Sequence, residues 1–570
     1  MMKKILILLL FVNTTYAQEK IEFFDPYELK KGMKGYALTV MQGLEPEKMG
    51  VEVISFMPNK LTKSGMILVK LFGDNVERTR VAAGMSGSPV YIDGKLVGAL
   101  AYTWANAIEL LAGIVPIQDM ISDKTRSGNT VFVPQHATSI QTAWFMNGIE
   151  ESDMLQKIQN VSTINTYRQG IEEFITVPSS RSNGIIPLKA GDAVAIKLIE
   201  GDINLASIGT VTYVDGEDVY IYGHPMDSEG PVSLPLAKAE IYDIMSSTKL
   251  SFKLGRALPE TIGSTIFDGL SSVYGRFDKK AVMIPVTINV TGKKYSNSYN
   301  MNMARSPKYL PTLLSEGMGA ILERELGKNI EKQVKLSWVL NFTNNQVVSN
   351  DTTWVRNTAY EPKSIKNYWK HYISILWSNS LVHLVPSKIV FNIDVKDEFY
   401  EYYGVEGVKL SKTAYLPGED ININLILQQY VSNDIYTNMV LSLPENIAEG
   451  VYTLIVGSAV AIKSELTELF PEKFTIRTEK QLLTELKKPI NNNMIEAVLI
   501  DVRSGSLIGN KFFDNIPQAR QSLFESKTSS GRNILTPKLF QNTLNMDAPV
   551  IGGKFVTIKI IVPMPLKTIS

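Results

Sequence analysis

The segment Gly84-Met85-Ser86-Gly87-Ser88-Pro89 contains the residues best suited to covalent chemistry. Gly84 permits a tight turn that exposes backbone N–H groups, and Ser86 then projects its hydroxyl from that turn. The N–H groups of Gly84 and Ser86 can form an oxyanion hole, and Gly87 leaves room for the backbone of a bound peptide. Asp93-Gly94, between two apolar runs, indicates a two-residue hairpin turn. We interpret Ser86 as a nucleophile; the alternative is a glycine-rich turn without chemistry.

A serine nucleophile needs a general base, and the chain has 4 histidines: His136, His224, His371 and His383. His136 lies in a polar connector, while His371 and His383 lie among aromatic and apolar residues, as structural histidines usually do. His224 instead follows two β-type runs and sits between Gly223 and Pro225. Those neighbours constrain the backbone and direct the imidazole away from the end of the sheet. We expect His224 to be the base; the alternative is a structural histidine in a turn.

Short strands surround each of the two motifs. Residues 33–125 contain alternating runs such as Val51–Phe56 and Met66–Leu71, and residues 185–300 return to the same pattern. We expect each cluster to form a small antiparallel barrel, with the site in the cleft between the two barrels. The sequence also predicts a helix from Ala143 to about Asn160 that bridges them.

The remainder of the chain predicts further β-structure with a few helices. Leu310–Leu326 has the spacing of an amphipathic helix packed on a barrel, and strands are expected at Lys335–Phe342 and Lys388–Val395. The run ININLIL alternates as in a half-buried antiparallel strand, which favours a β-sandwich. Thr478-Glu-Lys-Gln481 is a capping box, and Pro489 should end the helix that follows.

These patterns predict six segments. They are a signal peptide (1–17), a serine-motif half-barrel (18–130), a partly helical connector (131–184), a histidine-motif half-barrel plus helix (185–334), a β-sandwich-like module (335–460) and a mixed α/β C-terminal region (461–570).

Composition and the N-terminus indicate an exported bacterial protein. The 570 residues carry 58 basic and 57 acidic side chains, so charge gives no argument for binding nucleic acid. The chain contains 0 cysteines, which excludes disulfides, thiolate metal sites and a cysteine nucleophile. A basic start and a short apolar run at Ile5–Val12 precede Ala17, after which we expect signal cleavage. The mature chain should then be periplasmic or secreted, with no integral membrane segment.

Two signatures together resemble those of the sporulation stage-IV-B (SpoIVB-type) serine peptidase family. They are GMSGSPVYIDGKLVGA and YGHPMDSEGPVSLPLAKAEI, and the resemblance covers about residues 33–295. It implies a chymotrypsin-like double β-barrel in which Ser86 and His224 form the catalytic pair. In that family the histidine precedes the serine, whereas here Ser86 comes first, so the two halves look permuted. The family's peptide-binding module between the halves has no counterpart here.

The family's third catalytic residue has no clear match. Its aspartate lies on the strand that leads into the serine motif, where this chain has Phe72 with Asp74 close by. Asp74, Asp227 and Asp268 are all candidates to orient His224, and Asp74 is slightly preferred. If none of them serves, the site is a Ser–His dyad or an inactive one.

The sequence therefore predicts a mostly β, exported serine endopeptidase that acts on proteins or peptides. No cofactor and no metal ion are expected, because no metal-ligand spacing or phosphate-binding loop is present. The alternative function is that of a catalytically inactive, protease-like scaffold that binds a partner in the envelope or outside the cell.

Overall fold

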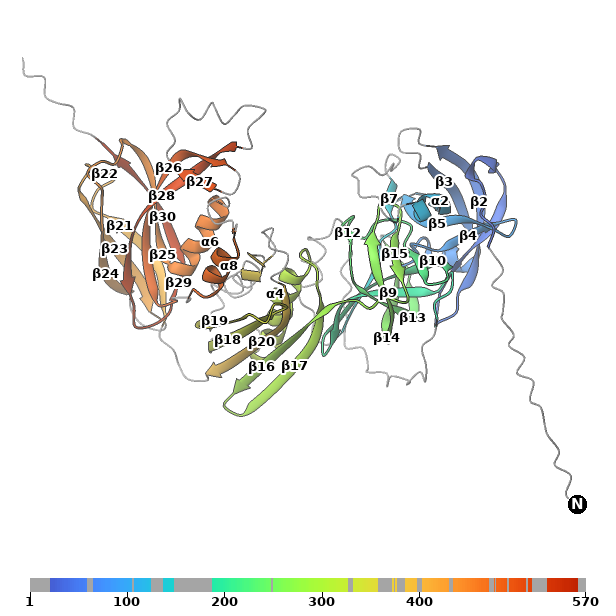
Figure 1. Cartoon of the computed structure of the whole chain (residues 1–570), viewed down its shortest axis with the longest axis horizontal. Coiled ribbons are helices and arrows are strands. Elements are labelled where there is room, and N and C mark those ends of the chain that lie inside the picture. Colours follow the sequence, from blue (N-terminus) through green and yellow to red (C-terminus); the bar gives the residue numbers. More distant parts are fainter. Residues whose placement is uncertain are drawn as a thin grey trace, which may run out of the picture. The chain divides into compact units, whose positions relative to one another are not determined.

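The fold is mostly β, as the sequence predicts (Figure 1). It is described from a computed structural model. The chain forms two compact units: unit 1 comprises Met1–Trp144, Ser182–Ile196 and Ser207–Lys280, and unit 2 comprises Phe145–Arg181, Lys197–Ala206 and Ala281–Ser570. The structure describes residues 21–58, 65–104, 107–122, 124, 137–147, 187–247, 250–326, 332–356, 372–373, 375–376, 385–396, 402–429, 434–470, 476, 478–488, 492–508, 511–514 and 531–561.

The serine motif lies in a ring of six strands in unit 1. The strands follow the order β4-β1-β2-β3-β6-β5, and β4 also pairs with β5, which closes the ring. Alternating apolar residues such as Val51, Val53, Val69 and Leu71 fill its interior. The elements are η1 (Pro26–Glu28), β1 (Lys34–Thr39), β2 (Glu47–Pro58), β3 (Gly65–Phe72), α1 (Asp74–Thr79), β4 (Pro89–Ile92), β5 (Lys95–Trp104), β6 (Leu111–Pro116), α2 (Ile117–Ser122) and β7 (Ala137–Ser139).

The expected hairpin at Asp93-Gly94 is confirmed. Ile92 pairs with Lys95, and both turn residues have positive φ, 50° at Asp93 and 77° at Gly94. Positive φ at both residues of a two-residue loop defines a type I′ turn, and the twist of this turn matches that of the flanking strands.

A second ring of strands carries the histidine motif. Its order is β9-β13-β14-β15-β11-β10, and β9 also pairs with β10. The expected turn at Asp215–Asp218 is present, because these two residues pair across β10 and β11. The strands are β8 (Ala143–Asn147), β9 (Ala193–Gly201), β10 (Asn204–Asp215), β11 (Asp218–Ile221), β12 (Gly230–Pro231), β13 (Pro235–Met245), β14 (Phe252–Asp268) and β15 (Val273–Arg276).

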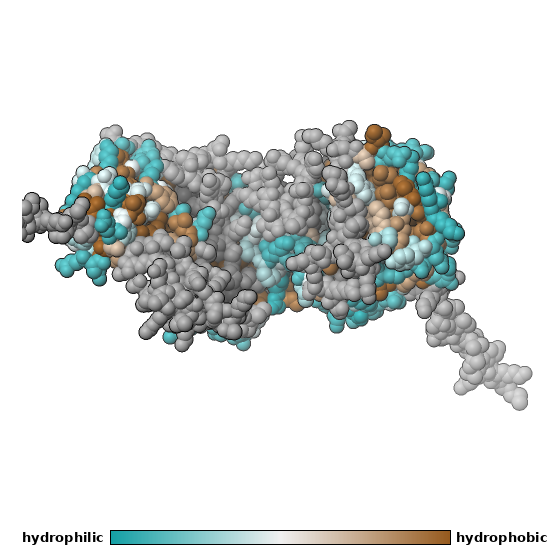
Figure 2. Space-filling model, turned by 90° about the horizontal axis from the view of Figure 1, so that it is seen from above, coloured by the Kyte–Doolittle hydropathy of each residue, from teal (hydrophilic) through white to brown (hydrophobic). Residues whose placement is uncertain are grey.

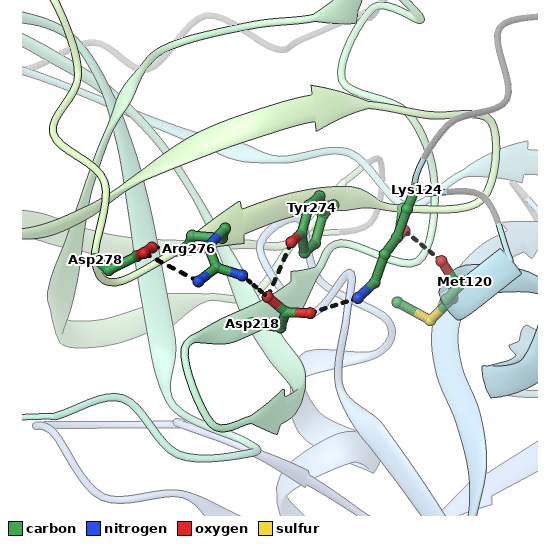
Figure 3. Close-up of polar contacts among 7 residues, drawn as sticks. Met120, Lys124, Asp218, Tyr274, Arg276 and Asp278 are labelled. Atoms are coloured by element: carbon green, nitrogen blue, oxygen red, sulfur yellow. Dashed lines mark hydrogen bonds and ion pairs between the residues drawn. The ribbon is translucent and has the colours of Figure 1, made fainter.

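A polar network ties the two rings of unit 1 together (Figure 3). Lys124, just beyond α2, forms an ion pair with Asp218 of the second ring, and Asp218 also accepts hydrogen bonds from Tyr274 at 2.9 Å and Arg276 at 2.8 Å. Burial alone would raise the pKa of Asp218, but the donors Lys124 and Tyr274, with the charge of Arg276, outweigh it and lower that pKa. The carboxylate therefore remains ionised at the junction.

Unit 2 contains a strand layer followed by two further sheets. The expected helix at Leu310–Leu326 is confirmed as α4, although it is buried on nearly all sides rather than on one face. Thr478 caps α8 by accepting a 3.2 Å hydrogen bond from the Gln481 N–H, as the capping pattern predicts. The elements are β16 (Met283–Gly292), β17 (Tyr295–Ala304), α4 (Leu310–Leu326), β18 (Lys332–Phe342), β19 (Val347–Arg356), β20 (Pro386–Lys396), β21 (Tyr403–Leu410), β22 (Ala414–Tyr415), β23 (Asp420–Gln429), β24 (Asp434–Ser442), β25 (Gly450–Ser458), α6 (Ala459–Leu469), α8 (Glu479–Leu486), β26 (Met494–Ile508), β27 (Lys511–Asp514), β28 (Gly531–Asn545), β29 (Val550–Ile551) and β30 (Gly553–Ile560).

Two sequence expectations need correction. Ala143–Asn147 forms strand β8 rather than the start of a helix, because Ala143, Trp144 and Met146 are buried in a sheet; residues 148–160 lie outside the described part of the chain. The sandwich core joins residues 403–456 with residues 495–560, so the predicted boundary at 460 cuts through one core. The C-terminal strands belong to the sandwich because β26 and β30 pair antiparallel with β25 in one sheet and contribute Ile495, Leu499 and Ile558 to the same core.

The described surface of each unit mixes hydrophilic and hydrophobic residues (Figure 2). No helix in the described part of the chain is both long and apolar enough to cross a membrane. The predicted signal peptide, residues 1–17, lies outside the described residues.

Candidate active site

Ser86 lies in a tight turn just before β4. The N–H of Ser88 donates to the Met85 carbonyl at 3.0 Å, and Gly87, the third residue of the turn, has φ of +92°. A turn with a left-handed third residue favours glycine at that position. Gly84 also has positive φ, +90°, and its N–H donates to the carbonyl oxygen of Gln141 at 2.8 Å. The Ser86 side chain is fully buried.

The serine turn is held directly by the second strand ring. The Ser86 carbonyl accepts a hydrogen bond from the Thr210 N–H at 2.9 Å, and the Gly87 carbonyl accepts one from the Thr212 hydroxyl at 2.7 Å. A Cβ atom at Gly87 would lie 2.1 Å from the Thr210 carbonyl oxygen. The space at Gly87 is therefore filled by β10, whereas the sequence suggested room for a substrate backbone.

His224 leaves β11 through a sharp bend that brings it to the same place. Tyr222 and Gly223 both have positive φ, 73° and 70°. A Cβ atom at Gly223 would lie 3.4 Å from the Leu100 carbonyl oxygen, and the N–H of Gly87 donates to that same oxygen at 2.8 Å. The serine turn and the histidine bend thus meet at Leu100 of β5.

The hydrogen bonds of His224 fix its tautomer. Nδ1 lies 2.6 Å from the Pro225 carbonyl oxygen, which can only accept, so Nδ1 carries the proton and Nε2 is the basic nitrogen. Among the described residues, neither His224 Nε2 nor Ser86 Oγ has a hydrogen-bond partner, although both atoms are buried. Burial lowers the pKa of His224, and the carbonyls of Pro225 and Ile140 oppose that effect.

The three candidate carboxylates have different positions. Asp268 is buried, and its oxygens accept hydrogen bonds from the N–H groups of Met226 at 2.8 Å and Asp227 at 2.7 Å. It thereby holds the loop that follows His224. Asp74 is exposed at the start of α1, and Asp227 is partly buried in the same loop. Neither nitrogen of His224 is hydrogen-bonded to any of the three, within the described residues.

A buried lysine that belongs to no sequence motif supports the serine turn. Lys253 Nζ donates to the hydroxyls of Thr39 at 2.7 Å and Thr210 at 3.2 Å, and the Thr210 hydroxyl donates to the Gly84 carbonyl at 2.9 Å. The lysine stem packs against Gly84, where a Cβ atom would lie 3.0 Å from Lys253 Cδ. Burial lowers the pKa of Lys253 to about 7.

In comparisons with protein-family models, curated proteins and solved structures, nothing matches this chain. The remaining histidines, His136, His371 and His383, lie outside the described residues.

Proposed function

We propose that the protein is a serine endopeptidase in which Ser86 is the nucleophile and His224 the general base. The observation that carries this proposal is the meeting of the two signature loops at Leu100, together with the hydrogen bond between Ser86 and Thr210. Two motifs separated by more than a hundred residues of sequence converge on one buried point. Among the described residues, the Ser86 hydroxyl and the His224 Nε2 are both buried without a hydrogen-bond partner, so neither atom is engaged in a structural contact.

The proposed chemistry follows the serine–histidine scheme. Ser86 Oγ attacks the carbonyl carbon of a peptide bond while His224 Nε2 takes the hydroxyl proton. The N–H groups of Gly84 and Ser86 stabilise the resulting oxyanion. His224 then returns the proton to the departing amine, and water hydrolyses the acyl-enzyme by the same steps. Positioned proton transfer of this kind contributes ~10²–10⁴-fold to the rate.

Asp268 is the carboxylate best placed to support His224 in this proposal. The Pro225 carbonyl accepts the Nδ1 proton, and the N–H of the same peptide group, that of Met226, donates to Asp268. Asp268 is therefore a positioning residue that acts through one peptide group. The sequence alone slightly favours Asp74, not Asp268, as the acid that supports His224.

The wider proposal includes fold and location. The two closed strand rings favour a double-barrel arrangement of the chymotrypsin type, with the serine half first in the chain. The basic and apolar start of the sequence supports export to the periplasm or beyond, with proteins or peptides as substrates.

The alternative function, an inactive binding scaffold, has one specific observation in its favour. The Gly84 N–H, expected to bind an oxyanion, already donates to Gln141. A binding scaffold that catalyses no reaction does not need a free N–H at Gly84.

Hydrolysis of fluorescently labelled casein tests the proposal. The wild type should release label, and Ser86→Ala, His224→Ala and the double variant should all lose at least about a thousandfold of that rate, without additivity. Thermal melts of each variant show whether a lower rate reflects lost catalysis or a loss of folding. Equal rates for the wild type and Ser86→Ala would favour the scaffold instead.

A further inference from the structure

A segment of the chain itself crosses the proposed active site. Residues 137–139 form β7, which pairs antiparallel with Tyr102–Trp104 of β5. The next residue, Ile140, continues the pairing, because its N–H donates to the Ala101 carbonyl at 2.7 Å. The segment thus runs as an extended strand along β5, the strand whose Leu100 joins the serine and histidine loops.

The following residue reaches the proposed oxyanion hole. The Gln141 carbonyl oxygen accepts the 2.8 Å hydrogen bond from the Gly84 N–H, which is one of the two donors expected to bind the oxygen of a scissile peptide bond. The Ile140 carbonyl lies by the His224 imidazole, where it favours the protonated ring. Gln141 therefore occupies the place that the residue before a cleaved bond would take.

We propose that residues 137–142 are an internal pseudosubstrate that closes the site to other peptides. This inference rests on the proposed peptidase function and concerns how that function is regulated. An extended segment of the same chain supplies both the strand pairing and the carbonyl that an incoming peptide would have to supply.

Burial shows that access to the site requires a movement of the chain. Ser86 is 0% and His224 2% exposed, so an external peptide reaches neither of them in this state, and the inference assigns the movement to residues 137–142. The closed state also leaves polar atoms without partners among the described residues: Gln141 Oε1, Thr142 Oγ1, Ser86 Oγ and His224 Nε2. Buried polar atoms without partners make a closed state costly, which favours reversible release of the segment.

A removable cross-link tests the inference while keeping the strand pairing, and the two threonine hydroxyl bonds that it removes are absent from the oxidised and the reduced form alike. Thr103 and Thr138 are paired across β5 and β7. Opposite residues in an antiparallel pair have Cα atoms about 4.5–5.5 Å apart, which suits a disulfide. The chain has 0 cysteines, so the double variant Thr103→Cys/Thr138→Cys introduces the only pair. The readout is the rate at which a fluorophosphonate probe labels Ser86 in the full chain.

The oxidised double variant should be labelled at least about tenfold more slowly than the same protein after reduction. The reason is that the labelling rate is proportional to the fraction of molecules in which the segment has left the site, and the disulfide lowers that fraction. The single variant Thr103→Cys is the matched control, and its labelling should not respond to oxidant. Equal labelling of the oxidised and reduced double variant would overturn the inference and leave the peptidase proposal standing.

A second variant loosens the segment instead of locking it. Ile140→Pro removes the N–H that donates to Ala101, and labelling of Ser86 should become roughly five- to tenfold faster than in the wild type. A thermal melt checks that this variant is folded. Labelling no faster than wild type in the folded variant would contradict the inference. If no form of the protein labels, this one included, the proposed function fails as well.

Discussion

One peptide group joins His224 to Asp268. Its carbonyl, from Pro225, accepts the Nδ1 proton of His224 at 2.6 Å, and its N–H, from Met226, donates to Asp268 at 2.8 Å. The imidazole is therefore oriented by a backbone oxygen whose position depends on a buried carboxylate. This arrangement makes the role of Asp268 testable apart from that of the other acids.

Asp268→Asn should lower kcat by about ten- to a hundredfold, because the amide replaces one of the two carboxylate oxygens that accept from the N–H groups of Met226, Asp227 and Glu229 by an NH2 group, which cannot accept. Since Asp268 acts by positioning, the acid limb of the pH–rate profile should also shift. Asp74→Asn, at an exposed position on α1, is the matched control and should leave both quantities unchanged. The account of Asp268 is wrong if the two variants behave alike.

The pH dependence of activity should reflect the buried state of His224. Burial lowers the pKa of His224 below the ordinary value of 6.5. The imidazole therefore stays neutral at pH values at which an exposed histidine is already protonated. Plotted against pH, kcat/KM should therefore fall only below 6.5. An acid limb centred above pH 6.5 would show that the base is another group or that the imidazole is not buried in the active form.

Lys253 should make stability depend on pH on the alkaline side of neutrality. Its pKa is about 7 in the folded protein against 10.5 for an ordinary lysine, so between these values the unfolded chain binds the extra proton. The free energy of unfolding should then rise as the pH rises from about 7 to about 10.5. Lys253→Met should remove most of that slope, as measured by urea unfolding at several pH values, while the exposed control Lys70→Met keeps it. An unchanged slope in Lys253→Met would refute the assignment.

Gly87 should be intolerant of any side chain, for a steric reason. A Cβ atom there would lie 2.1 Å from the Thr210 oxygen and 2.6 Å from the Tyr222 nitrogen, both backbone atoms. Gly87→Ala should separate the serine turn from β10 and lower the melting temperature by several degrees or more. Gly94→Ala is the control, because its φ is also positive but no atom lies within 4 Å of the added Cβ; it should cost only about 1 kcal/mol. Equal effects of the two substitutions would argue against the close packing at Gly87.

The parts of the fold that sequence could predict are those governed by local rules. The hairpin at Asp93-Gly94, the cap at Thr478 and the helix at Leu310–Leu326 each depend on neighbouring residues. Sequence alone favours a helix at Ala143–Asn147, where the structure has a strand, because short apolar runs fit either element and only burial in a sheet decides between them.

The sequence singles out the two candidate side chains but not the residues that support them. Ser86 and His224 stand out because glycine and proline flank them, which is a local signal. Lys253 carries no such signal, since it is one lysine in an ordinary strand and its role arises from Thr39 and Thr210, both distant in sequence. The contact of Gln141 with Gly84 is likewise a product of tertiary pairing along β5.

The central claim is that Ser86 is a nucleophile activated by His224, and covalent labelling with a fluorophosphonate tests it most directly. Mass spectrometry of the labelled full-length chain should place the adduct on Ser86. Ser86→Ala should show none, and His224→Ala should label at least about a hundredfold more slowly because the hydroxyl then lacks its base. Ile140→Pro should be labelled in parallel, so that a closed site is not mistaken for an inert one. An adduct elsewhere, or no adduct in either the wild type or Ile140→Pro, would contradict the account.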